Sequence, residues 1–334
     1  MRRAFQLAAL GTGEVSPNPM VGCVVVYDGK IIGEGYHKEY GTAHAEPNAI
    51  NNVADKGLLK KSTLYVSLEP CSHWGKTPPC ADLIISHHIP KVVIANTDPN
   101  PLVAGKGMEK LKNAGIEVIS GVLEAEGNEL NKRFFTFHKQ KRPYIILKWA
   151  QTADGFVARE NFDSKWISND YSRQLVHKWR TEEDAILVGF NTALHDNPQL
   201  NVRQWHGRNP VRIVLDPHLQ LPHTHHLFDG SQKTIVFHST KTGKNVTGVE
   251  QIEIDDCKSP KSILKALYEQ KILSVIIEGG AATLQRFIDA KLWDEARIFI
   301  SPNTFGKGIS APSVSGNLYH EEYMLGDVLK VMRH

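Results

Sequence analysis

The residues with the clearest chemical potential lie between His44 and Cys80. Glu46 follows His44 by two positions. Cys71 lies 25 residues after Glu46 and directly follows a proline, and Cys80 directly follows two further prolines. One imidazole and two thiolates can bind Zn²⁺ and leave its fourth coordination position open to water. Zinc lowers the pKa of bound water to about 7, and a nearby carboxylate can move the protons of that water. The sequence therefore predicts a hydrolytic zinc centre, with His44, Cys71 and Cys80 as ligands and Glu46 as the catalytic residue.

The elements around these residues are expected to bring them together. His44 begins an expected helix, and Cys71 follows an expected strand. Thr77 fits the cap of a second helix and Pro78 its first position, which puts Cys80 in the first turn. The partial positive charge of a helix N-terminus favours the thiolate, the form that binds metal. Taken singly, each of these residues could be an ordinary buried side chain, but their joint pattern favours the metal centre.

The first half of the chain indicates an α/β sandwich, because strands alternate with helices after an initial hairpin. Asp28-Gly29 separates two apolar runs and fits the tight turn of that hairpin. The expected helices cover residues 2–10, 44–55, 78–88, 107–114 and 124–138, and the expected strands cover residues 21–27, 30–36, 63–68, 91–95 and 117–120.

The second half indicates a separate α/β domain with a largely parallel sheet. A basic break at residues 139–142 predicts one domain over 1–142 and another over 143–334. The sequence lacks the Gly-x-Gly-x-x-Gly dinucleotide fingerprint. Glu278-Gly279-Gly280 could hold a phosphate on backbone N–H groups or form only a tight turn. The expected strands cover residues 144–149, 185–188, 211–215, 234–238, 274–277 and 297–301, and the expected helices cover residues 171–181, 259–270 and 281–290.

The composition is that of a globular protein without a large nucleic-acid surface. Of the 334 residues 41% are hydrophobic and 22% charged, and the net charge is only +3. Four cysteines are too few for a disulfide framework and fit a reducing compartment. Cys23 lies within an expected strand and Cys257 follows two aspartates, and both are expected to be non-ligand thiols. The first ten residues favour an amphipathic helix over a signal peptide, and no apolar run reaches the roughly 18–20 residues of a membrane span. We expect a cytoplasmic protein.

The spacing of the two cysteines narrows the prediction. The pattern is close to the zinc-deaminase signature, but eight residues, 72–79, separate the cysteines where that signature has two. The segment from Leu68 to Cys80 closely resembles the deaminase half of the bifunctional riboflavin-biosynthesis deaminase–reductase family. Further matches are residues 17–22, 98–101 and 105–107 for that half, and residues 148–155, 164–168, 189–203 and 277–280 for the reductase half, which is similar in fold to dihydrofolate reductase.

The resemblance implies two reactions on one small molecule and no nucleic-acid or membrane partner. One zinc ion would serve deamination of a diaminopyrimidinone that carries a ribosylamino 5′-phosphate. NADPH would then reduce the ribosyl group to ribityl. Asn18 would help to hold the ring, while His73 and Lys76 are candidates for the phosphoribosyl part or belong to a solvated loop. A homo-oligomer, dimeric or tetrameric, is also expected.

The same resemblance implies the lining of the reductase site. The cofactor would contact Ala150, Trp166, Thr192, Asp196 and the turn at Gly280, and the substrate would contact Ser164, Arg180, Leu200, Arg203 and Glu278. Three of these residues could instead have a purely structural role. Arg180 could form a salt bridge on a helix surface, Asp196 could belong only to a turn, and Trp166 could belong only to the core. The histidines at 223–226 are expected to lie in a loop without a functional metal.

Two other functions stay open at this point. The zinc centre could act on another nucleotide while the second half has a different role. The protein could also act on an RNA base, with the second half presenting nucleic acid, although the low net charge argues against this.

Overall fold

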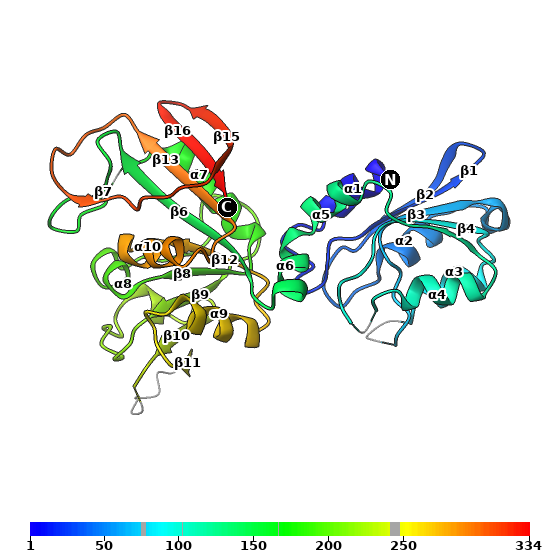
Figure 1. Cartoon of the computed structure of the whole chain (residues 1–334), viewed down its shortest axis with the longest axis horizontal. Helices are drawn as coiled ribbons and strands as arrows, with labels where there is room; N and C mark the ends of the chain where they lie inside the picture. Colours follow the sequence, from blue (N-terminus) through cyan, green and yellow to red (C-terminus); the bar gives the residue numbers. More distant parts are fainter. Residues whose placement is uncertain (75–77, 102, 166, 241–247) are drawn as a thin grey trace. The chain divides into compact units, whose positions relative to one another are not determined.

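The structure is a computed structural model of the chain that describes residues 1–74, 78–101, 103–165, 167–240 and 248–334. It divides into two compact units, Met1–Lys141 and Arg142–His334, which are described separately (Figure 1). No helix among the described residues is both long and apolar enough to cross a membrane.

The described part of the first unit contains a five-stranded mixed sheet in the order β2-β1-β3-β4-β5. Strand β1 pairs antiparallel with β2 and β3, whereas β3, β4 and β5 are mutually parallel. Asp28 and Gly29 have φ values of 49° and 70°, which confirms the tight turn predicted for the β1–β2 hairpin. The strands are β1 (Gly22–Tyr27), β2 (Lys30–Tyr36), β3 (Thr63–Leu68), β4 (Lys91–Asn96) and β5 (Glu117–Ile119).

Helices cover both faces of this sheet because successive side chains of a strand point to opposite sides. On β1, Cys23 and Val25 face the core formed with α2, α3 and α4, and Val24 faces α1. Helix α2 lies close to β2, since a Cβ atom added to Gly35 would be 2.3 Å from the backbone nitrogen of Ala49. The helices are α1 (Arg2–Ala9), α2 (Ala45–Asn51), α3 (Cys80–Ser86), α4 (Lys106–Asn113), α5 (Glu124–Leu130) and α6 (Lys132–Gln140), with a 3-10 helix η1 (Lys56–Lys61).

Two expectations for the first unit are wrong in detail. Helix α3 starts at Cys80 with Pro79 as its N-cap, so Pro78 is not its first residue, and Thr77 lies outside the described residues. The single helix expected over 124–138 is broken at Asn131. The side chain of Asn131 accepts from the backbone N–H of Met20 (2.8 Å) and donates to the Met20 carbonyl (2.9 Å). A contact with a distant segment therefore interrupts a helix that the local sequence favours.

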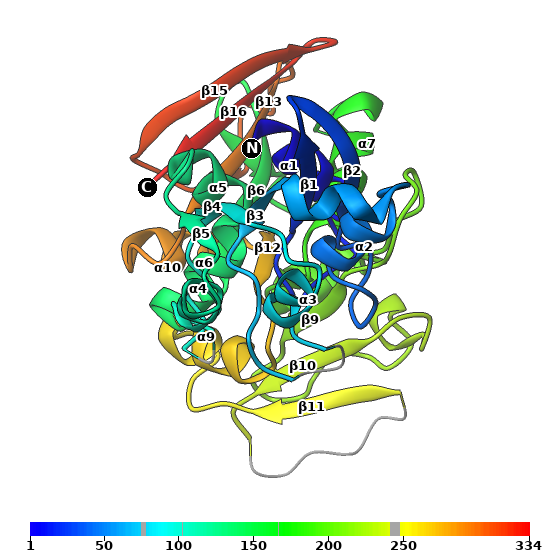
Figure 2. The same ribbon diagram turned by 90° about the vertical axis from the view of Figure 1, so that its right-hand side faces the viewer.

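The second unit is built on a nine-stranded sheet, counted over its described residues, in the order β11-β10-β9-β8-β12-β6-β13-β16-β15. Neighbours are parallel from β11 to β13, which confirms the largely parallel sheet. The hairpin β15–β16 continues it antiparallel at one edge (red in Figure 2). The strands are β6 (Tyr144–Thr152), β8 (Ala185–Val188), β9 (Val211–Leu215), β10 (Thr234–His238), β11 (Val249–Glu253), β12 (Ser274–Glu278), β13 (Glu295–Ser301), β15 (Asn317–Met324) and β16 (Asp327–Arg333).

The remaining elements of the second unit connect these strands. A short pair, β7 (Phe156–Ala158) and β14 (Ile309–Ser310), lies outside the main sheet. The sequence did not predict α8, β7, β11 or β14–β16. The side chains of β15 are exposed except at Met324, so this strand carries little apolar alternation. The helices are α7 (Asp170–Glu182), α8 (Phe190–Asp196), α9 (Pro260–Glu269) and α10 (Ala281–Asp289), with a 3-10 helix η2 (His226–Phe228).

Candidate active sites

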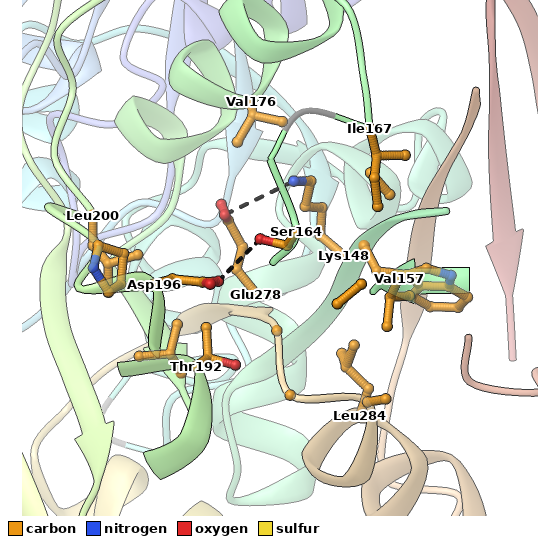
Figure 3. A pocket seen from close by; sticks show the side chains of 18 of the residues that line it. Lys148, Val157, Ser164, Ile167, Val176, Thr192, Asp196, Leu200, Glu278 and Leu284 are labelled. Atoms are coloured by element: carbon orange, nitrogen blue, oxygen red, sulfur yellow. Dashed lines mark hydrogen bonds and ion pairs between the residues drawn. The ribbon is translucent and has the colours of Figure 1, made fainter. Parts of the chain in front are cut away.

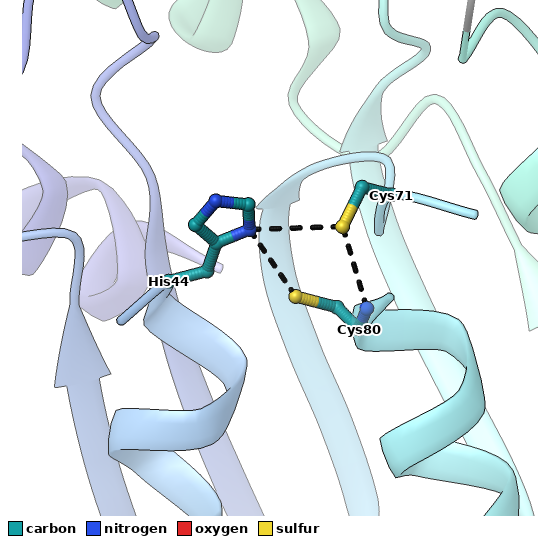
Figure 4. Close-up of side chains that lie close together, drawn as sticks. All are labelled: His44, Cys71 and Cys80. Atoms are coloured by element: carbon teal, nitrogen blue, oxygen red, sulfur yellow. Dashed lines mark hydrogen bonds between the residues drawn. The ribbon is translucent and has the colours of Figure 1, made fainter. Parts of the chain in front are cut away.

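The structure brings His44, Cys71 and Cys80 together at one point of the first unit (Figure 4). His44 is the N-cap of α2, Cys71 lies in the loop after β3, and Cys80 is the first residue of α3. Their possible ligand atoms all lie within 4.8 Å of one another. The Nδ1 atom of His44 is 3.7 Å from the Cys71 sulfur and 3.4 Å from the Cys80 sulfur.

The surroundings of the two thiols suit metal binding. The backbone N–H of Cys80 donates to the Cys71 sulfur at 3.3 Å. Contact with the Cys80 thiol, together with His44, lowers the pKa of Cys71 to about 4, while the same contact raises the pKa of Cys80. Their contact therefore favours one thiolate within the pair. Two sulfurs and one imidazole form a soft donor set that fits Zn²⁺ and leaves a fourth position for water.

Glu46 lies in the first turn of α2 beside these ligands. Its side chain is only 3% exposed. Burial, with the negative Cys71 thiolate nearby, raises the pKa of Glu46 to about 7. The carboxyl group therefore adjoins the metal ligands in a site largely closed to bulk water.

Asn18 is linked to this centre through a residue that the sequence did not single out, His37. The Nδ1 atom of His37 lies 3.1 Å from the Ala43 carbonyl, which can only accept, so Nδ1 carries the proton. Nε2 is then free to accept from the Asn18 amide nitrogen at 3.1 Å. The His37 ring also meets the His44 ring edge-on, with centroids 5.3 Å apart. The side chain of Asn18 is therefore oriented next to a metal ligand.

A buried carboxylate, Glu69, holds the segment that carries Cys71. Glu69 is 4% exposed, and its two oxygens accept four backbone N–H groups. The donors are Asp98 (3.3 Å) and Gly105 (2.9 Å) to Oε2, and Gly107 (2.9 Å) and Met108 (3.2 Å) to Oε1. These bonds tie the ligand loop to the start of α4. The sequence shows Glu69 only as part of a motif and gives no sign of this role.

The long loop between the cysteines is only partly described. His73 is exposed, and Lys76 lies outside the described residues. Their expected contacts with a phosphoribosyl group stay predictions.

The second unit contains a cavity of about 400 Å³ at the carboxyl ends of its central strands (Figure 3). Helices α7, α8 and α10 complete its wall. The wall includes every described residue expected at the reductase site: Ala150, Ser164, Arg180, Thr192, Asp196, Leu200, Arg203, Glu278 and Gly280. Trp166, the remaining one, lies outside the described residues.

An ion-pair network occupies one side of this cavity. Arg180 donates from Nε to Oε1 of Glu278 at 3.1 Å and from Nη2 to Oε2 at 2.9 Å. Burial alone would raise the pKa of Glu278, but Arg180 and Lys148 hold it at about 2. Arg180 is 9% exposed, so the alternative of a salt bridge on a helix surface is wrong. In this structure its paired bonds go to Glu278.

Lys148 is a cavity residue to which the sequence assigned no role. Its Nζ lies 3.9 Å from Oε2 of Glu278, and burial lowers its pKa (Figure 3). The signal in the sequence was a single lysine inside the apolar run that forms β6. A lysine in a buried parallel strand needs a partner, and this one finds Glu278 on the neighbouring strand β12.

A loop of the cavity wall lies against the end of α8. The Ser164 hydroxyl donates to Oδ2 of Asp196 at 3.3 Å (Figure 3). Phe162 stacks on His195 with ring centroids 4.3 Å apart. Asp196 is the last residue of α8 and not only part of a turn, and burial raises its pKa.

The turn before α10 provides a glycine cradle. Gly279 and Gly280 have φ values of 102° and 74°, which side-chain-bearing residues rarely adopt. A Cβ atom added to Gly279 would lie 3.0 Å from Cγ2 of Thr192. The backbone N–H groups at this helix start can donate hydrogen bonds to a phosphate. The glycine cradle and the cavity together therefore fit a dinucleotide such as NADPH.

The histidine cluster lies in the loop that includes η2. The carbonyl of His226 accepts from Nη1 of Arg212 at 2.5 Å, and the backbone N–H of His226 donates to Asn197. Both contacts use the backbone and anchor the loop. Cys23 and Cys257 are buried free thiols in the two hydrophobic cores.

Comparison with known proteins decides the family. A family model described as "RibD C-terminal domain" matches residues 143–324, and one described as "Cytidine and deoxycytidylate deaminase zinc-binding region" matches residues 1–96. The chain is 45% identical to the riboflavin biosynthesis protein RibD of Aquifex aeolicus, an alignment that covers 93% of this chain and 88% of the relative. The chain belongs to the RibD family. The Escherichia coli RibD is 36% identical over 92% of this chain and 88% of its own length.

Solved structures of RibD proteins share the whole fold. A Thermotoga maritima protein, titled as a diaminohydroxyphosphoribosylaminopyrimidine deaminase and 5-amino-6-(5-phosphoribosylamino)uracil reductase, is 44% identical with a TM-score of 0.91, covering 100% of this chain and 97% of that one. Acinetobacter baumannii RibD is 35% identical with a TM-score of 0.92, covering 99% and 97%. The resemblance seen in the sequence is therefore confirmed, and neither alternative function is favoured.

Proposed function

We propose that this chain catalyses two successive steps of riboflavin biosynthesis. Residues 1–142 would deaminate 2,5-diamino-6-ribosylamino-4(3H)-pyrimidinone 5′-phosphate, and residues 143–334 would reduce the ribosyl group of the product to ribityl with NADPH. The observation that carries the proposal is the convergence of His44, Cys71 and Cys80 beside the buried Glu46. Membership of the RibD family supports the pairing of both activities in one chain.

In the first unit the chain's residues hold the ring and move protons. When bound by the three ligands, Zn²⁺ supplies a water molecule of lowered pKa. Glu46 would accept the two protons of the attacking water in turn, the first as the oxygen adds to the ring carbon that bears the 2-amino group and the second as the carbonyl forms. It would deliver the first proton to the ring nitrogen and the second to the amino group, which leaves as ammonia. Asn18, whose amide nitrogen contacts Nε2 of His37, would hydrogen-bond the ring.

In the second unit the residues position two ligands and shield them from water. NADPH, when bound, supplies the hydride for the reduction. The cradle at Gly280, with Ala150, Trp166, Thr192 and Asp196, would hold the cofactor. Ser164, Arg180, Leu200, Arg203 and Glu278 would hold the substrate.

The chemistry of Lys148 and Arg203 suggests a separate role for each in the cavity of the second unit. Burial lowers the pKa of Lys148, so its ammonium group becomes a better proton or hydrogen-bond donor toward the group being reduced. Arg203 donates from Nη1 to the side-chain oxygen of Asn201 at 3.1 Å. It is exposed, whereas Arg180 is buried. A planar guanidinium suits the sugar phosphate.

The direct test supplies the diaminopyrimidinone ribosyl phosphate with NADPH and identifies the products by mass. The wild-type protein should release ammonia and consume NADPH. Glu46→Gln should retain zinc and lose ammonia release, while still reducing the deaminated substrate. Glu39→Gln, at an exposed position of the same unit, is the matched control and should retain both steps. Continued deamination by Glu46→Gln would refute the proton-transfer role.

The homo-oligomer, dimeric or tetrameric, and the cytoplasmic location stay predictions. Light scattering of the purified protein and fractionation of cells would test them.

A further inference from the structure

A buried histidine, His177, lies in the wall of the second-unit cavity and has no role in the function proposed above. Arg173, His177 and Arg180 are spaced four and three residues apart on α7, so they share one face of the helix. All three line the cavity. We propose that Nδ1 of His177 accepts a hydrogen bond from a hydroxyl group of the substrate's sugar-phosphate chain. This inference rests on the proposed function and concerns the specificity of the same site.

His177 carries an unpaired polar atom. The His177 side chain is 3% exposed, and Nδ1 has no hydrogen-bond partner among the described residues. The ring interacts with the backbone carbonyl of Asn201, which can only accept and therefore faces the protonated nitrogen. This arrangement leaves Nδ1 with a lone pair. Buried polar atoms nearly always have a partner, and because His177 lines the cavity we infer that the bound ligand supplies the donor.

The charge state of His177 determines which ligand group it can bind. Burial, followed by the positive charges of Arg180 and Arg203, lowers the pKa of His177 to about 4, and Glu278 opposes this only in part. The imidazole is therefore neutral at physiological pH. A lone pair repels phosphate oxygens and attracts an O–H or N–H donor. Nδ1 of His177 is thus a neutral hydrogen-bond acceptor, whereas the arginines around it are charged donors.

The cavity wall around His177 is rich in arginine. Guanidinium groups can only donate, so Arg173, Arg180 and Arg203 suit an anion. The Glu278 carboxylate already accepts two bonds from Arg180. His177 therefore adds a neutral acceptor to a helix face whose other two cavity residues, Arg173 and Arg180, can only donate. A sugar phosphate carries an anion and hydroxyl groups only a few bonds apart, and so matches donors and an acceptor on one helix face.

The test uses the ribityl product and its three monodeoxy analogues as competitive inhibitors of the full-length protein. For the wild type, removal of one particular hydroxyl should raise the inhibition constant about ten- to a hundredfold, the range expected for a lost bond to a buried group. His177→Leu should bind the intact product as weakly as the wild type binds that analogue, with no further loss on the analogue. His177→Asn is close to leucine in size but keeps an oxygen near the Nδ1 position, so it should recover part of the affinity.

Several results would overturn the inference. Equal affinity of the wild type for all four compounds would do so without any variant, even where His177→Leu fails to fold. So would an unchanged inhibition constant in His177→Leu, or equal losses on all four compounds, which would indicate a role in phosphate binding or folding. NADPH binding, measured by fluorescence, should stay unchanged in every variant. Failure of the wild type to reduce the deaminated substrate would instead refute the proposed function.

Discussion

The carboxylate of Glu69 should be essential to the zinc centre although it touches no proposed metal ligand through its side chain. Each of its oxygens accepts two backbone N–H groups at 2.9–3.3 Å. In Glu69→Gln one oxygen becomes an amide nitrogen, which cannot accept. Whichever way the amide turns, two buried N–H groups lose their acceptor.

The size of the effect follows from these bonds. A hydrogen bond to a charged group contributes about 1.5–3 kcal/mol, so two lost bonds should destabilise the first unit by about 3–6 kcal/mol before relaxation. Cys71 follows Glu69 by two residues and should lose its position. Disturbance of groups that orient metal ligands typically lowers metal affinity about 10–100-fold.

The assay compares zinc affinity and both activities in one sample. Competition with a chromogenic chelator gives the zinc affinity, and urea unfolding gives the stability. Reduction of the deaminated substrate serves as an internal control, because Glu69 belongs to the first unit. Glu39→Gln, exposed in that unit, controls for the change of charge. A Glu69→Gln protein with zinc affinity within about twofold of wild type and an unchanged unfolding midpoint would refute this reasoning.

Three further predictions follow from the same contacts. Gly107→Ala should lower zinc affinity and deamination but not reduction, because its Cβ would meet the Pro70 carbonyl at 2.0 Å; metal competition measures this, and full zinc affinity would contradict it. Arg180→Met removes the hydrogen-bonded partner of the buried Glu278 carboxylate and leaves only the more distant Lys148 of its two described ion-pair partners, 3.9 Å away. It should lower the free energy of unfolding by about 3 kcal/mol at pH 7, the low end of the range for breaking a buried ion pair. The pKa of Glu278 in the folded protein, about 2, lies below its ordinary value of 4.5. The ion pair therefore stabilises the wild type above about pH 4.5, and this stabilisation is lost as the pH falls toward 2. The thermal unfolding temperatures of the wild type and Arg180→Met should converge over that pH range. Removal of zinc with a chelator should abolish ammonia release and spare NADPH oxidation with deaminated substrate, and parallel loss of both would show that the units depend on each other.

Local patterns in the sequence were sufficient to predict the three residues that converge as metal ligands and most of the central strands and helices. Strand β3 and strands β8, β9 and β10 have the predicted bounds, because apolar runs between turn residues mark buried strands. His44 and Cys80 fall at helix starts as expected, although the cap and first residue predicted for α3 were wrong in detail. The cysteine spacing and the family motifs indicated the chemistry.

Tertiary structure decided what depends on residues distant in the chain. Asn131 breaks a helix because it pairs with Met20, more than a hundred positions away. Edge strand β15 forms by pairing with β16 and has no buried face of its own to mark it. Glu69 and His177 acquire their roles from backbone groups and charges that converge only in the folded chain. Local propensity acts over a few neighbours, whereas burial and electrostatic partners are set by packing, and for this reason the sequence determined the reaction centre while the fold determined the residues that hold it.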